Sequence, residues 1–151
     1  MLTIPEAKRM VKELGLPPED FLEFSTNIDS KLTPHYPLLV QHAGKVHEYF
    51  IILKRRQKRD CVFLQNDLKC GVYENRPAVC RLYPFELDGK DVKKGALCPV
   101  RFAREGQMEK DADALVKDLV SHEVAARKWC KGHGEKGERP DIKKFIEYFK
   151  A

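Results

Sequence analysis

Four of the five cysteines lie in one window of the chain, with the spacing Cys61-x8-Cys70-x9-Cys80-x17-Cys98. Four thiolates can bind one tetrahedral zinc ion or the four corners of a [4Fe–4S] cube. Structural zinc sites usually take their ligands as C-x2–4-C pairs, and this window has no such pair. An iron–sulfur cluster is larger and can take ligands from separated loops, so the spacing favours a cluster. Cys98-Pro99 also matches the Cys-Pro that ends a bacterial ferredoxin motif.

Two other interpretations of these cysteines stay open. They could hold zinc in a structural module for protein or nucleic-acid contact, or they could be buried free cysteines, since free Cys is among the most buried residue types. A disulfide framework is not expected, because the number of cysteines is odd and no export signal precedes them. We therefore expect a metal centre with Cys61, Cys70, Cys80 and Cys98 as ligands, a [4Fe–4S] cluster as cofactor and zinc as the alternative.

The sequence motifs around these cysteines are specific enough to compare with known families. Cys61 to Leu64 reads CVFL, and Cys70 to Phe85 reads CGVYENRPAVCRLYPF. The chain resembles the cysteine-cluster family described as a putative zinc- or iron-chelating domain, whose pattern is C-x-F-L, C-x-I/V-Y-x-x-R-P-x-x-C-R-x-F/Y-P-F and a later Cys. The early Leu-Thr and the stretch LGLPPEDF also look like this family, so the resemblance covers roughly residues 1 to 100. It implies a zinc- or iron-chelating protein. As function we expect iron–sulfur cluster binding in an electron-transfer or accessory subunit of a larger complex.

The resemblance has one departure and one remote implication. The family takes its name from an earlier C-x-x-C-x-x-C-C block, and this chain has no cysteine before Cys61. If the gene product begins upstream of Met1, we expect the added segment to carry that block. The family also includes proteins described as flagellin lysine N-methylases. A protein lysine N-methylase-like enzyme is therefore a remote alternative, although no Gly-rich loop follows a clear strand here, and an enzyme is not the favoured interpretation.

Polar residues near the cysteines are candidates for a supporting role. Arg76 and Arg81 could donate hydrogen bonds to cluster sulfurs, with Tyr83 beside them as a further candidate. Alternatively, the two arginines tie the loop through carboxylates such as Glu74 or Glu86.

Cys130-x2-His133 is a weaker candidate for a metal half-site. Two ligands cannot hold zinc alone, so a core cysteine at a helix end, followed by a histidine that favours the helix C-terminus, is the competing interpretation. His122 falls on the apolar face of a predicted helix, which predicts a core histidine.

A basic run lies just before the first cysteine and consists of Lys54, Arg55, Arg56, Lys58 and Arg59. A solvated turn is one interpretation, and a docking site for an acidic protein partner or complex is the other. Nucleic acid is a weaker possibility, because no aromatic residues are interleaved for base stacking.

The elements that must position these residues follow from periodicity and turn chemistry. We expect an α+β fold, a small helix-rich single domain (residues 1–151) with a short β-hairpin and an irregular centre organised by the four-cysteine site. Helices are predicted over about 1–24 and about 109–150, and the metal-binding core over about 46–100. Val46 to Leu53 and Cys61 to Leu64 are predicted strands that could pair across the basic turn, and Asp88-Gly89 predicts a second hairpin.

Composition agrees with a folded protein. The chain has 151 residues, 42% of them hydrophobic, and a formal net charge of +5. The longest apolar run, Tyr49 to Leu53, is too short to cross a bilayer. With no leader-like N-terminus, we expect no membrane association and a cytoplasmic location.

Overall fold

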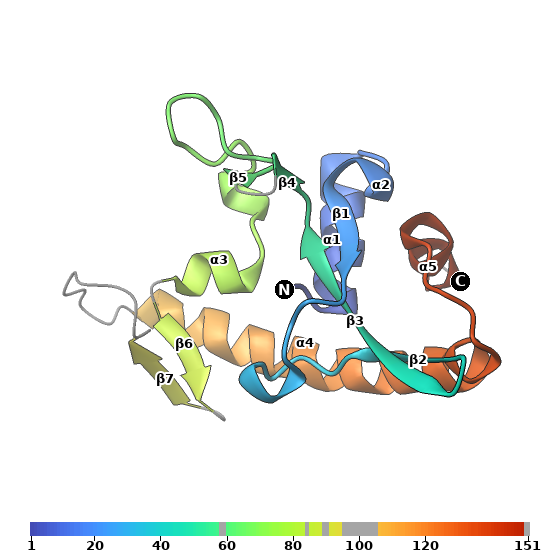
Figure 1. The fold of residues 1–151 in the computed structure, drawn as a ribbon. Helices are drawn as coiled ribbons and strands as arrows, with labels where there is room; N and C mark the ends of the chain where they lie inside the picture. Colours follow the sequence, from blue (N-terminus) through green and yellow to red (C-terminus); the bar gives the residue numbers. More distant parts are fainter. Residues whose placement is uncertain (58–59, 84, 89–90, 95–105, 150–151) are drawn as a thin grey trace.

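The computed structural model describes residues 1–57, 60–83, 85–88, 91–94 and 106–149 (Figure 1). The α-helices are α1 (Ile4–Leu14), α2 (Pro18–Phe21), α3 (Ala78–Leu82), α4 (Gly106–Gly132) and α5 (Ile142–Tyr148). The strands are β1 (Leu22–Ser25), β2 (Leu38–His42), β3 (Lys45–Leu53), β4 (Arg55–Arg56), β5 (Asp60–Cys61), β6 (Phe85–Asp88) and β7 (Asp91–Lys94). Short 3-10 turns are η1 (Ser30–Leu32), η2 (Tyr73–Asn75) and η3 (Gly134–Lys136). The α+β class is confirmed.

Helix α1 begins and ends where its local sequence predicts. The Thr3 side chain accepts the backbone N–H of Glu6, and the Glu6 carboxylate accepts the backbone N–H of Thr3, which is a complete capping box. Gly15 ends the helix in the left-handed region with φ 64°, a conformation that costs glycine little.

Strand β3 is the centre of the main antiparallel sheet, whose order is β1-β3-β2. β1 pairs with the second half of β3 (Leu22 opposite Leu53), and β2 pairs with the first half (Leu38 opposite Tyr49). Leu2 forms an isolated bridge with Ile51, its N–H donating to the Ile51 carbonyl at 2.9 Å. The start of the chain is therefore fixed to β3.

Two predictions for this region were wrong. The helix expected to reach residue 24 ends at Phe21, because the backbone of Leu22–Ser25 pairs with β3 instead. The strand over residues 46–53 does not pair with Cys61 to Leu64. A smaller hairpin spans the basic turn, with Arg55 opposite Cys61 in the β4–β5 pair. The β6–β7 hairpin is present as predicted, with Asp88 opposite Asp91.

Helix α4 carries two hydrophobic clusters along its length. Its first half packs Ala112 and Leu115 against Ala78 and Leu82 of α3. Its second half packs Ala126 and Trp129 into the larger core formed with α1, α2, α5 and the main sheet. Figure 1 shows α4 running beneath both groups, so it joins the cysteine-bearing part of the chain to the rest.

His122 is a buried core histidine, as its place on the apolar face of α4 predicts. Its Nδ1 accepts the Ile4 N–H at 3.1 Å, and its Nε2–H donates to the Tyr36 carbonyl at 2.8 Å. Burial lowers the pKa of His122, so the neutral ring bridges α4, α1 and the segment before β2.

Among the described residues, none of the helices combines the length and apolar character needed to cross a lipid bilayer.

Gly134 provides a direct test of how η3 packs on β2. A Cβ at this position would lie 2.0 Å from the Leu39 carbonyl oxygen, whereas a Cβ at Gly132 would meet nothing within 4 Å. We expect Gly134→Ala to lower the free energy of unfolding by about 1–3 kcal/mol or more, because backbone must move. Urea denaturation measures this, with Gly132→Ala as the matched control. Similar losses for both variants would contradict the close approach of η3 to β2.

Candidate metal centre

Cys61 is held by the small hairpin that follows the main sheet. It lies in β5 opposite Arg55 of β4, and its carbonyl accepts the Leu64 N–H at 3.0 Å. The hairpin is attached to the body of the fold at Lys54, whose N–H donates to the Phe21 carbonyl and whose carbonyl accepts the Val62 N–H. Cys61 is half-buried.

Cys70 comes at the end of a tight loop. The Gln65 N–H donates to the Lys69 carbonyl at 2.8 Å, and Leu64 forms an isolated bridge with Cys70. The Gly71 N–H then donates to the Phe63 carbonyl at 2.8 Å. These bonds return the chain toward the segment that begins at Cys61, and they leave Cys70 half-buried.

Cys80 lies in α3, and α3 is fixed by a buried carboxylate. Glu6 is 1% exposed. Its Oε1 accepts the Ala78 N–H at 2.7 Å, while its Oε2 accepts the Thr3 N–H at 2.9 Å and the Thr3 hydroxyl at 3.0 Å. The carboxylate that caps α1 therefore also holds the first residue of the helix that carries Cys80.

Cys61 and Cys80 line the same pocket, which has a volume of about 570 Å³. Most of its walls are apolar. The one charged side chain among the described lining residues is that of Arg55. The lining residues are Met1, Leu2, Ile28, Ile52, Leu53, Arg55, Cys61, Pro77, Val79 and Cys80. A pocket of this composition can accept an anionic, thiolate-ligated group beside a guanidinium.

The surroundings of Cys80 raise the pKa of its thiol. The residue has an exposed edge, but the chain packed around the sulfur desolvates it, and this is the largest cause. The charges of Cys61 and Cys70 add smaller contributions in the same direction. Cys61 and Cys70 thus lie near enough for their charges to act on Cys80, and a metal must displace the Cys80 proton to bind its sulfur.

The full ligand set stays a prediction. Cys98 lies outside the described residues. Within the described part of the chain, no three His, Cys, Asp or Glu side chains are grouped closely enough to hold a metal ion.

Arg76 and Arg81 have structural partners that the sequence did not identify. The Arg81 Nε donates to the Asp111 carboxylate at 2.9 Å, and its Nη1 donates to the Arg76 carbonyl at 2.7 Å. The Arg76 guanidinium lies 3.6 Å from the centre of the Tyr73 ring. Tyr83 ends α3 and is 71% exposed. Arg81 therefore joins α3 to α4 through Asp111.

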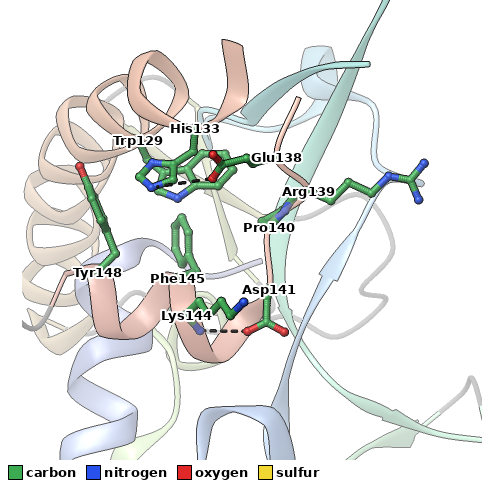
Figure 2. A pocket seen from close by; sticks show the side chains of 9 residues that line it. All are labelled: Trp129, His133, Glu138, Arg139, Pro140, Asp141, Lys144, Phe145 and Tyr148. Carbon is green, nitrogen blue, oxygen red and sulfur yellow. Dashed lines mark hydrogen bonds and ion pairs between the residues drawn. The ribbon is translucent and has the colours of Figure 1, made fainter. Parts of the chain in front are cut away.

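Cys130 and His133 each have other partners. The Cys130 Sγ accepts the Leu39 N–H at 3.1 Å, and burial is the main reason that its pKa is raised. His133 stacks on Trp129 with ring centres 5.4 Å apart, and its Nε2 lies 4.0 Å from the Glu138 carboxylate. Figure 2 shows His133 between Trp129 and Tyr148 in a separate pocket of about 490 Å³. Nothing in the described structure unites this pair with a third ligand.

Sequence patterns did not identify two residues that the structure places at the candidate metal centre. Arg55 is one of five cations in a run, and only its position opposite Cys61 distinguishes it from its neighbours. Glu6 caps α1 through a local contact with Thr3, but its bond to Ala78 spans 72 positions, and no local pattern reports such a contact.

Comparison with known proteins gives one family. Residues 18–99 match the model of the CxxCxxCC family, described as "Putative zinc- or iron-chelating domain". The match covers more than half of the chain and includes Cys61, Cys70, Cys80 and Cys98. The chain therefore belongs to this family, which supports metal binding in general. No curated protein and no solved structure matches significantly.

The role of Glu6 leads to a prediction about both stability and metal binding. Glu6→Ala should lower the free energy of unfolding by about 3 kcal/mol, because the Ala78 and Thr3 donors stay buried without acceptors. It should also weaken metal retention, because α3 carries Cys80. Urea denaturation and metal analysis measure the two effects. Glu13→Ala, an exposed carboxylate of the same helix, is the control, and equal effects from both variants would contradict the anchoring role.

Proposed function

We propose that this member of the zinc- or iron-chelating family binds a [4Fe–4S] cluster through Cys61, Cys70, Cys80 and Cys98. We further propose that it serves as an electron-transfer or accessory subunit of a larger complex. The observation that carries the proposal is the pocket of about 570 Å³ that Cys61 and Cys80 share with Arg55. Family membership supports metal chelation but leaves the kind of metal group open.

The donor set fits a cluster in two respects. All four candidates are thiols, the ligands that iron–sulfur clusters take. The four cysteines are also separated by 8, 9 and 17 residues, without the C-x2–4-C pairs that structural zinc sites usually use. A single zinc ion needs four ligand atoms at about 2.0–2.3 Å, whereas a cluster bridges ligands that lie farther apart.

The chain's own residues would control the environment of such a group. A bound cluster would supply reversible one-electron chemistry. Ile52, Leu53 and Val79 line the pocket with apolar surface, and Arg55 places a positive charge in the same pocket as the thiols of Cys61 and Cys80. Both features influence the reduction potential of an iron–sulfur centre.

The same edge of the molecule supports docking of an acidic protein partner. Arg55 and Arg56 are both exposed along β4, and successive side chains of a strand point to opposite faces. Lys54 is already engaged, because its Nζ donates to the Glu19 carbonyl. Lys58 and Arg59 lie outside the described residues. We therefore assign Arg56 to partner contact and Arg55 to the pocket.

Metal analysis tests the cluster proposal. Protein purified anaerobically should be brown and contain iron and acid-labile sulfide in equal amounts, with a paramagnetic signal after reduction by dithionite. Cys→Ser at 61, 70, 80 or 98 should each remove most of the iron, because each thiolate is a cluster ligand. Cys130→Ser is the matched control and should retain it. Colourless protein with one zinc per chain would support the zinc module instead. Iron loss from Cys130→Ser with retention in Cys98→Ser would contradict the ligand set.

The two arginines of β4 should have separable effects. Arg55→Gln should weaken metal affinity about tenfold or more, as loss of a residue that supports metal ligands typically does, measured by chelator competition. Arg56→Gln should leave metal affinity unchanged but reduce capture of a native partner at low salt, because exposed charges steer association and are screened by salt. Equal metal affinity in both variants would contradict the assignment of Arg55.

A further inference from the structure

A second pocket, of about 320 Å³, lies next to the cysteine pocket and shares Val79 of α3 with it. Leu82 of α3, Leu87 of β6 and Leu115 of α4 make much of its surface apolar. Figure 1 shows that α3, β6 and the first half of α4 lie together at one end of the fold. The proposed cluster uses none of these three leucines, so the pocket requires a separate explanation.

His35 is the buried polar ring in this pocket. It is 4% exposed. Desolvation is the largest cause that lowers its pKa to about 3, with smaller contributions from the amino terminus and His122. The imidazole is therefore neutral at physiological pH and has one N–H donor and one acceptor nitrogen.

Thr33 determines which ring nitrogen carries the proton. The Thr33 hydroxyl accepts the backbone N–H of His35 at 3.2 Å and lies 3.0 Å from its Nδ1. If the hydroxyl donates its proton to Nδ1, it acts both as an acceptor for the backbone N–H and as a donor to the ring. The ring proton is then on Nε2. In the opposite tautomer the hydroxyl would accept both hydrogen bonds, and its proton would need a different acceptor. The structure thus favours Nε2–H as the donor.

This Nε2 is buried and has no hydrogen-bond partner among the described residues. Buried donors are nearly always paired, and leaving one unpaired is costly. Because Thr33 occupies Nδ1 and His35 lines the pocket, Nε2–H is the ring group available to a molecule bound there. The group that pairs with this donor must be a hydrogen-bond acceptor. Because the walls of the pocket are apolar, the rest of the bound molecule should be apolar as well.

We propose that this pocket is a binding site for a small, largely apolar molecule with one carbonyl oxygen, which accepts the His35 Nε2–H. The volume suits one ring with a short substituent, since a dry cavity of about 150 Å³ already holds benzene. The proposal does not depend on the cluster, because it uses His35 rather than the cysteines and a different chemistry, although Met1 and Val79 line both pockets.

The test compares two probes of nearly equal shape on the full chain. Acetophenone has the carbonyl oxygen, and isopropylbenzene replaces it with a methyl group. Calorimetry measures the affinity for acetophenone divided by the affinity for isopropylbenzene. This ratio should fall about tenfold in His35→Phe, because the variant has no donor for the carbonyl. His47→Phe, which replaces a half-buried histidine of β3 that does not line this pocket, should leave the ratio unchanged.

A measurement on the native protein avoids reliance on variants that fail to fold. The His35 Nε2–H resonance should move downfield when acetophenone saturates the pocket and should not move downfield with isopropylbenzene. An unmoved resonance at saturating acetophenone would overturn the proposal, as would an affinity ratio unchanged by His35→Phe. Failure of acetophenone to bind would also overturn it and would indicate that ordered water satisfies the ring.

Discussion

The buried carboxylate of Glu6 holds the start of the chain and the cysteine-bearing helix in one arrangement. A charged group that is 1% exposed must be compensated by strong hydrogen bonds. Glu6 receives donors from Thr3 and from Ala78, so the same charge that stabilises α1 also positions α3. Removing the carboxylate would leave donors buried on two segments that are far apart in the sequence. The position of Cys80 depends directly on this bond.

Helix α4 provides the second constraint, because both hydrophobic clusters use it. Arg81 and Asp111 fix α3 to its first half by an ion pair at 2.9 Å. His122 fixes α1 to its second half through the Ile4 N–H. Each of these polar contacts lies beside one of the two hydrophobic clusters. The neutral His122 ring and the partly buried Arg81–Asp111 ion pair therefore determine how the two halves of α4 contact the rest of the chain.

The centre of the molecule combines apolar walls with thiols and one guanidinium. Apolar walls desolvate Cys80 and raise its pKa, which disfavours the thiolate when no metal is bound. A metal centre reverses this preference, because its positive charge stabilises the thiolates and releases their protons. The next pocket shares Met1 and Val79 but contains His35, so α3 borders two pockets with different polar groups.

Features with local causes were determined by the sequence. The capping box of α1, the pairing of β6 with β7 and the apolar face of α4 depend on residues within a few positions of one another. The cysteine pattern was enough to identify the family. Contacts between distant segments were decided only by the tertiary structure. Leu22–Ser25 became a strand because β3 offered unpaired backbone groups, and Arg55 was distinguished from Arg56 because it lies opposite Cys61. Local propensity cannot encode such pairings, because the partner that satisfies a backbone group or a buried charge is chosen by packing across the whole chain.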